Sequence, residues 1–153
     1  MKNLITATLF AAATVTSAFM AVPAIAADKP TVALSNAFLG NAWRRSMITA
    51  FEEAATKAEA DGLIASFQVS NAPGENSPTE QIAQLKALLL DQPDILLVNP
   101  ASPTALNPTL QQACNMGIVV AVFDSSTDLD CVHIVTNSFG DWARLSTQAV
   151  IDG

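Results

Sequence analysis

Short apolar runs alternate with longer amphipathic segments along most of this chain, and this alternation restricts the possible folds more than any other feature. The short runs are predicted to be strands, and they cover residues 31–35, 63–70, 94–98, 118–122 and 132–135. Apolar residues recur at helical spacing after the first, second, third and fifth run. Because strands that are apolar throughout are usually buried on both faces, the pattern predicts an α/β fold. We expect right-handed βαβ units that form a parallel sheet of about five strands with helices on both faces.

Helix boundaries are marked by particular residues. The first helical pattern begins near Trp43 and ends near Gly62. In residues 77–80, Ser is a predicted N-cap, Pro occupies the first helical position and Glu completes a capping box. A second Ser-Pro pair at 102–103 predicts the start of the next helix, which Gly117 would end.

The first thirty residues have the organisation of a secretory signal peptide. Lys2 is followed by an apolar run over residues 4–22, and residues 24–26 read Ala-Ile-Ala. These are the n-region, the h-region and the cleavage site, so cleavage is predicted after Ala26. The run approaches membrane-spanning length, which leaves an uncleaved anchor as the alternative. Thr and Ser within the run and the cleavage site that follows favour the signal peptide. The expected organisation is a signal peptide over 1–26 and one exported domain over 27–153.

The charge balance is acidic. The chain has 7 Lys and Arg against 14 Asp and Glu, a net charge of −7, and it contains no basic run. Nucleic acids and anionic membrane surfaces are therefore poor candidates as partners.

Two cysteines, Cys114 and Cys131, are present. In an exported protein such a pair favours a disulfide, although two buried free thiols remain the alternative. A metal site is not expected, because the single histidine, His133, and two distant cysteines do not make a ligand set.

Polar residues gather where the predicted strands end. In an open parallel sheet, ligands bind outside the carboxyl ends of the strands. Neutral amides, hydroxyls, one carboxylate, a guanidinium and an aromatic ring are suited to a sugar, whose hydroxyls both donate and accept hydrogen bonds. The candidate ligand-binding residues are Ser35, Asn41, Trp43, Arg44, Asn99, Asp124 and Asn137.

Each of these residues also has a purely structural interpretation. Asn at a strand end often serves a turn, and Trp43 could belong to the core beneath the first helix. Motifs for enzymes are missing: no G-x-G-x-x-G follows the first strand, and there is no P-loop and no G-x-S-x-G. His133 has no evident nucleophile beside it, and Asp124 has no second carboxylate nearby in sequence. The sequence predicts a binding protein without a cofactor rather than an enzyme.

Three segments carry a resemblance to a known family. These are residues 40–44 followed by Phe-Glu-Glu-Ala-Ala at 51–55, Leu-Val-Asn-Pro at 97–100, and the run from Gly117 to Asp124. In order and spacing they resemble the type I periplasmic sugar-binding proteins, the solute receptors of bacterial ABC importers in the ribose, galactose and galactofuranose group. The resemblance implies a Rossmann-like lobe, a small-molecule sugar as ligand and a membrane permease as partner.

The resemblance also assigns roles to single residues. Trp43 and Arg44 match the aromatic residue and the arginine that meet the sugar, and Asp124 matches the aspartate that bonds to its hydroxyls. The family often has Arg after that aspartate, whereas this chain has Ser125, so the set of hydroxyls recognised by the ribose-like members does not carry over directly. The family's Asp-Asn pair after the fifth strand matches residues 137–138, with one residue of uncertainty in register.

Type I receptors have two lobes that close on the sugar, and the resemblance places residues 27–153 in the N-terminal lobe. A fragment, a truncated gene or a partial sequence would each account for the length. The expected function is that of a periplasmic receptor that captures a sugar for an ABC importer. The alternative is an extracytoplasmic sensing domain that serves a chemotaxis receptor or a sensor kinase. A sugar-binding transcription regulator of this fold is disfavoured by the signal peptide and the missing helix-turn-helix.

Overall fold

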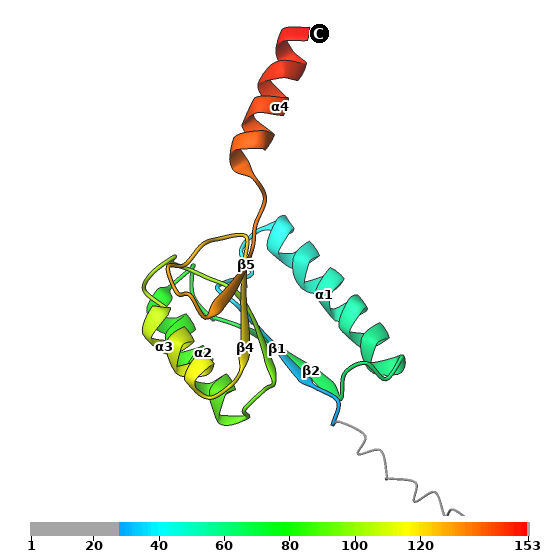
Figure 1. Ribbon diagram of the computed structural model, residues 1–153, viewed down its shortest axis with the longest axis vertical. Helices are drawn as coiled ribbons and strands as arrows, with labels where there is room; N and C mark the ends of the chain where they lie inside the picture. The colour runs from blue at the N-terminus through cyan, green and yellow to red at the C-terminus, as the bar shows by residue number, and fades with distance from the viewer. Residues whose placement is uncertain (1–27, 153) are drawn as a thin grey trace, which may run out of the picture.

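A five-stranded parallel sheet forms the centre of the protein, as the sequence predicts. The computed structural model describes residues 28–152, and the predicted signal peptide lies outside this range. The strand order is β2-β1-β3-β4-β5, and every neighbouring pair is parallel (Figure 1). The strands are β1 (Thr31–Asn36), β2 (Ser66–Asn71), β3 (Ile95–Asn99), β4 (Val119–Phe123) and β5 (Val132–Val135).

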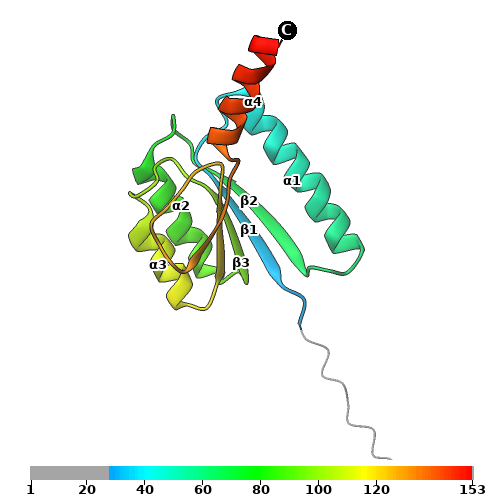
Figure 2. The ribbon, with the colours of Figure 1, turned by 45° about the horizontal axis from the view of Figure 1, so that its top comes forward.

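Helices lie on both faces of this sheet. Figures 1 and 2 show α1 on one face, α2 and α3 together on the other, and α4 projecting away from the sheet. The helices are α1 (Ala42–Ala60), α2 (Pro78–Leu90), α3 (Asn107–Asn115) and α4 (Phe139–Asp152). None of the helices among residues 28–152 is both long enough and apolar enough to cross a membrane.

The main hydrophobic core lies between the sheet and the helices α2 and α3. Alternate residues of the strands point into it, because successive side chains of a strand face opposite sides. Each fully buried Leu or Val contributes about 1.5–3 kcal/mol through removal of apolar surface from water. The core residues are Ala33, Leu85, Leu88, Leu89, Leu96, Val98, Leu106, Leu110, Ala113, Ile118, Val120, Val122 and Val132.

The opposite face is covered mainly on its β1–β2 side. There Phe51 of α1 packs edge-to-face on Phe67 of β2, with ring centroids 5.9 Å apart. On the β4–β5 side of the sheet, Val119 is 51% exposed and Val135 is 64% exposed. These two strands therefore bury less of their apolar surface than the sequence pattern suggests.

Two predicted boundaries are wrong. The second strand begins at Ser66 rather than Leu63, because Leu63 closes the turn after α1, where its N–H donates to the carbonyl of Ala58 (2.8 Å). The third helix begins at Asn107 rather than at Ser102-Pro103. A helix that started at Ser102 would place Pro108 in its interior, where proline removes a hydrogen bond and clashes with the preceding turn.

The start of α2 is close to the prediction. Ser77 is the N-cap, and its hydroxyl accepts a hydrogen bond from the N–H of Glu80 (3.3 Å). The reciprocal half of the capping box is not formed among the described residues. Instead, Glu80 Oε2 is buried without a hydrogen-bond partner, and it lies so close to Gly74 that a Cβ at this glycine would collide with it.

Candidate functional site

The carboxyl ends of the strands meet the beginning of α1 at one edge of the sheet (Figure 2). A cavity of about 230 Å³ opens there, lined by Trp43, Phe123, Asp124, Val135, Thr136 and Asn137. Three of the seven sequence-predicted binding residues, Trp43, Asp124 and Asn137, thus share one cavity. Trp43 is 50% exposed and is not part of the core cluster, so it presents an open aromatic surface.

Arg44 lies beside this cavity in a fixed orientation. Its guanidinium stands over the Phe38 ring at 4.9 Å and near the Trp43 ring at 6.0 Å, which are cation–π distances. Its Nη1 donates to Oδ1 of Asn36 (2.8 Å). Burial lowers the pKa of Arg44, and the negative charge of Asp124 opposes this change. Arginine stays protonated in any case, so a guanidinium and a carboxylate flank the same opening.

Asp124 directly follows β4 in an unusual backbone conformation. Its φ of 55° lies in the left-handed region, which Asp and Asn tolerate better than most residues. Its N–H donates to the carbonyl of Val135 (3.2 Å), which ties the end of β4 to the end of β5. The Asp124 side chain is exposed. Its carboxylate is therefore presented to solvent at the cavity and can accept hydrogen bonds from a ligand.

Asn41 stabilises the beginning of α1 at this edge of the sheet. It is the N-cap of α1, and its Oδ1 accepts a hydrogen bond from the N–H of Arg44 (2.8 Å). The cap places Trp43 and Arg44 in the first turn of the helix, next to the ends of the strands. The residue is exposed, so its amide nitrogen remains available to a ligand.

Ser35 and Asn99 are fully buried below the edge and do not line the cavity. The Ser35 hydroxyl donates to Gln84 Oε1 (2.7 Å) and accepts from Gln81 Nε2 (3.1 Å), which also donates to the Asn99 carbonyl (3.0 Å). Both residues thus take part in the attachment of α2 to the sheet. The sequence signal for this network was the pair Gln81 and Gln84, which lies next to the apolar residues Leu85 and Leu88 on the side of α2 that faces the sheet.

Asn36 is a structural residue of the site that the predicted set omitted. It is fully buried, and its Nδ2 donates to the Phe38 carbonyl and to Asn71 Oδ1, both at 2.8 Å. Its Oδ1 holds Arg44. One side chain therefore joins the end of β2, the loop after β1 and the guanidinium. Its position at the strand end was the only hint in the sequence.

Cys114 and Cys131 form the predicted disulfide, with their Cα atoms 6.3 Å apart. The bond joins α3 to the residue that immediately precedes β5. Within residues 28–152, no group of three or more His, Cys, Asp and Glu side chains is arranged to hold a metal ion.

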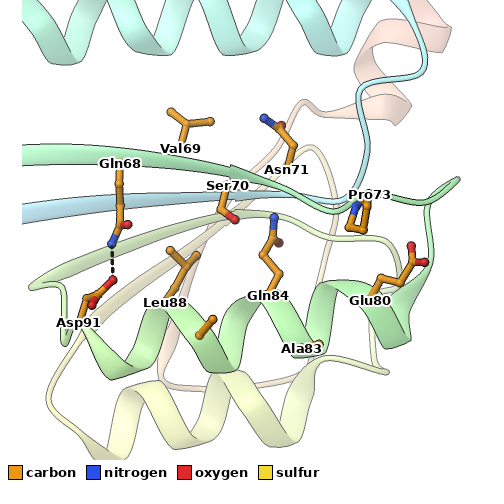
Figure 3. Close-up of a pocket in the computed structure, with 11 residues that line it drawn as sticks. Gln68, Val69, Ser70, Asn71, Pro73, Glu80, Ala83, Gln84, Leu88 and Asp91 are labelled. Carbon is orange, nitrogen blue, oxygen red and sulfur yellow. Dashed lines mark hydrogen bonds between the residues drawn. The ribbon is translucent and has the colours of Figure 1, made fainter.

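A larger groove, of about 530 Å³, runs between β2 and α2 on another side of the protein (Figure 3). Gln68 and Ser70 of β2 point into it, and Gln68 Nε2 donates to Asp91 Oδ2 at 3.4 Å. The groove exists because β2 is an edge strand that α2 covers incompletely. None of the seven predicted binding residues lines it, so the cavity at the carboxyl edge remains the candidate site.

A parallel sheet with an aromatic ring and a carboxylate in a cavity at its carboxyl edge, and a guanidinium beside them, is the arrangement expected of one lobe of an α/β solute-binding protein. Residues 32–153 match the family model described as "Periplasmic binding protein domain". The chain belongs to this family of periplasmic solute-binding proteins.

Solved structures agree with this assignment. An ABC transporter solute binding protein from Thermobispora bispora DSM 43833 is 61% identical, with a TM-score of 0.73 over 77% of this chain. A periplasmic solute binding protein from Actinobacillus succinogenes 130z with bound D-allose is 26% identical, with a TM-score of 0.59 over 67% of this chain. A periplasmic ribose ABC transporter from Conexibacter woesei DSM 14684, 24% identical with a TM-score of 0.66 over 84% of this chain, shows the shared fold.

The chain spans well under half the length of these proteins: 37%, 34% and 41% of the three structures, respectively. A search among curated protein sequences finds no match.

Proposed function

We propose that residues 27–153 supply the N-terminal, sugar-binding lobe of a periplasmic receptor that delivers a sugar to the permease of an ABC importer. The observation that carries the proposal is the meeting of Trp43, Arg44 and Asp124 at one cavity edge. The 61% identity to an ABC transporter solute binding protein supports it. So do the D-allose, L-rhamnose and D-arabinose bound in other structures of this fold.

The chemistry of recognition follows from these three side chains. A sugar hydroxyl donates to the Asp124 carboxylate, and Arg44 donates to a hydroxyl oxygen through the N–H groups that Asn36 does not occupy. The exposed ring of Trp43 covers the apolar C–H face of the sugar. These contacts bind and orient a neutral ligand. Asp124 has no second carboxyl group beside it among the residues that line the cavity, so the pair of carboxylates used by glycosidases is not assembled there, and we propose a receptor that works without a cofactor rather than an enzyme.

The importer role is favoured over the sensing-domain hypothesis by the comparisons, since the matched structures are described as components of ABC transporters. Export through the signal peptide over 1–26 is part of the proposal. Mass spectrometry of the protein from a periplasmic extract should find an N-terminus at Ala27. A chain that retains Met1 and sediments with membranes would contradict this part.

The binding function is tested by titration of the chain with D-allose, L-rhamnose, D-arabinose and D-ribose, followed by nuclear magnetic resonance. The indole signal of Trp43, assigned with the help of a Trp142→Phe variant, should shift with one of these sugars, and an Asp124→Ala variant should not respond. If no sugar perturbs Trp43 at tens of millimolar, the proposed function is wrong for this site.

A further inference from the structure

One wall of the candidate cavity is built from the ends of β4 and β5. Phe123 and Asp124 come from the end of β4, while Val135, Thr136 and Asn137 come from β5 and the residues after it. The Asp124 N–H donates to the Val135 carbonyl, which joins the two ends. The shape of the cavity therefore depends on how firmly β5 is held.

Strand β5 has few contacts of its own. It is four residues long and lies at the edge of the sheet, with β4 as its single neighbour. Only Val132 is buried, and Ile134 and Val135 are exposed. The helix that follows, α4, projects away from the sheet instead of covering the strand (Figures 1 and 2). Exposed backbone pairing with little apolar burial belongs to the part of a protein that opens most readily.

The segment before β5, residues 125–131, is fastened to α3 at several points. Cys131 is bonded to Cys114 of α3. The Thr127 hydroxyl donates to Asn107 Oδ1 (2.8 Å), and Asn107 Nδ2 donates to the Asp128 carboxylate. Leu129 packs against the hydrophobic core. Helix α3 is itself fixed, because Leu110 and Ala113 are fully buried in that core.

From this arrangement we infer that the Cys114–Cys131 disulfide and Asn107 are positioning residues for the sugar site. They hold β5 and Asp124 in place relative to Trp43, the residue of α1 that lines the same cavity. The inference rests on the proposed function for its consequence in binding, while the positioning itself is a property of the chain that can be measured without a ligand.

The test compares the wild type with the variants Cys114→Ala/Cys131→Ala and Asn107→Ala. Asn107→Ala is informative because Leu106, which makes no side-chain cap, occupies the N-cap position of α3; the substitution therefore removes the loop contacts without removing a helix cap. Amide hydrogen exchange should become at least about tenfold faster in residues 132–135 of the double variant and remain unchanged in β1 and β3. In both variants, the affinity for the sugar that shifts the indole signal of Trp43 should fall about tenfold.

Leu89→Ala is the matched control, because Leu89 lies in the core on α2, away from β5 and the cavity. It should lower the melting temperature and leave the sugar affinity measured well below that temperature unchanged. Equal losses of affinity in Leu89→Ala and the cysteine variant would show a role in global stability alone and would overturn the inference. Unchanged exchange in residues 132–135 would overturn it as well.

The outcomes separate the two hypotheses. A wild-type chain that binds no sugar refutes the proposed function, and the exchange rates of residues 132–135 still decide the positioning role. A wild-type chain that binds sugar while both variants bind it equally well refutes the inference and leaves the proposed function intact. If the double variant does not fold, Asn107→Ala provides the same comparison.

Discussion

At the scale of single residues, contacts within the protein fix the polar side chains of the candidate site. These side chains nevertheless keep hydrogen-bonding groups free for a ligand. Arg44 is stacked on Phe38 and bonded to Asn36, yet most of its donors remain free. The backbone N–H of Asp124 donates to the carbonyl of Val135, while its carboxylate stays exposed. Pre-positioned groups of this kind lose little conformational freedom when a ligand binds.

Asp124→Asn should weaken sugar binding by about 1.5–3 kcal/mol, the usual contribution of a hydrogen bond to a charged group. Asparagine tolerates the left-handed backbone of this position, so the free energy of unfolding should change by less than about 0.5 kcal/mol. Calorimetric titration and urea unfolding measure the two effects. Asp91→Asn, the same substitution in the groove beside β2, is the control. An unchanged affinity would exclude Asp124 from the site.

Trp43→Ala distinguishes a stacking residue from a core residue. Because Trp43 is half exposed and lies outside the core, its truncation should cost less than about 1 kcal/mol of folding free energy, against about 3–5 kcal/mol for a buried aromatic side chain. Sugar affinity should fall much more. Trp142→Ala, which alters the only other tryptophan, is the control for fluorescence and binding. A lower melting temperature with binding intact would assign Trp43 to the core instead.

At the scale of the elements, buried hydrogen bonds fix the position of α2 on the sheet. Gln81 is fully buried and contacts the ends of β1 and β3 through Ser35 and Asn99. Its Oε1 also accepts the N–H of Ala101 (2.7 Å). These bonds join the carboxyl ends of β1 and β3 to α2.

Gln81→Ala should reduce the free energy of unfolding by about 2–4 kcal/mol, since it leaves a cavity in the core and the half-buried Ala101 without a partner for its N–H. Urea denaturation measures the loss as a shift of the midpoint. The exposed Gln112→Ala on α3 should have an effect within about 0.5 kcal/mol. Similar effects of the two substitutions would contradict the role assigned to Gln81.

A pH-dependent contact joins the beginnings of β1 and β3. The Thr31 N–H (2.7 Å) and hydroxyl (2.8 Å) donate to the Asp94 carboxylate, and they lower the pKa of Asp94 below its ordinary value of 3.8. A lowered pKa means that the contact contributes fully above pH 3.8 and is lost as the pH falls through the lower value of the folded state.

The difference in unfolding free energy between the wild type and Asp94→Asn should therefore be constant near neutral pH and shrink below pH 3.8. Urea unfolding over a series of acidic buffers measures it. Thr31→Val, which keeps the backbone donor and removes the hydroxyl, should show a smaller change in the same direction. A stability difference that does not vary with pH would show that Asp94 makes no such contribution.

At the scale of the whole molecule, the described chain leaves apolar surface uncovered. Val119 and Val135 are exposed on the sheet, and Trp142, Leu145 and Val150 are exposed on the projecting α4. Exposed apolar patches and an open sheet edge favour association with other chains. The candidate cavity is likewise small and formed by one lobe, at about 230 Å³, so a bound sugar keeps the face that points away from the sheet in water.

Residues 27–153 alone should therefore bind monosaccharides no better than millimolar and should self-associate, because most of the affinity of a small ligand comes from its enclosure. Calorimetry and analytical ultracentrifugation of the same preparation measure both properties. Micromolar affinity in a monodisperse, monomeric sample would show that one lobe is sufficient for binding.

Much of the fold and part of the site were predictable from local patterns. The core strands β1, β3 and β4 were found because apolar runs of this length are buried in parallel sheets. Trp43, Asp124 and Asn137 were expected at one edge because carboxyl ends of parallel strands meet there, and they line one cavity in the structure; their role in binding stays a prediction. The starts of β2 and α3 were missed, since a turn at Leu63 and the backbone requirement of Pro108 interrupt the patterns there.

The sequence by itself determined the periodicity of each element and the helix start at Ser77, because these depend on neighbouring residues. It favoured the cysteine pairing, which the structure then showed. Only the tertiary structure decided the strand order, the burial of Ser35, Asn36 and Asn99, and the incomplete cover of β4 and β5. Those features arise from contacts between segments distant in the chain. The face on which a side chain lies, and the helix that covers it, are settled only when the sheet has assembled.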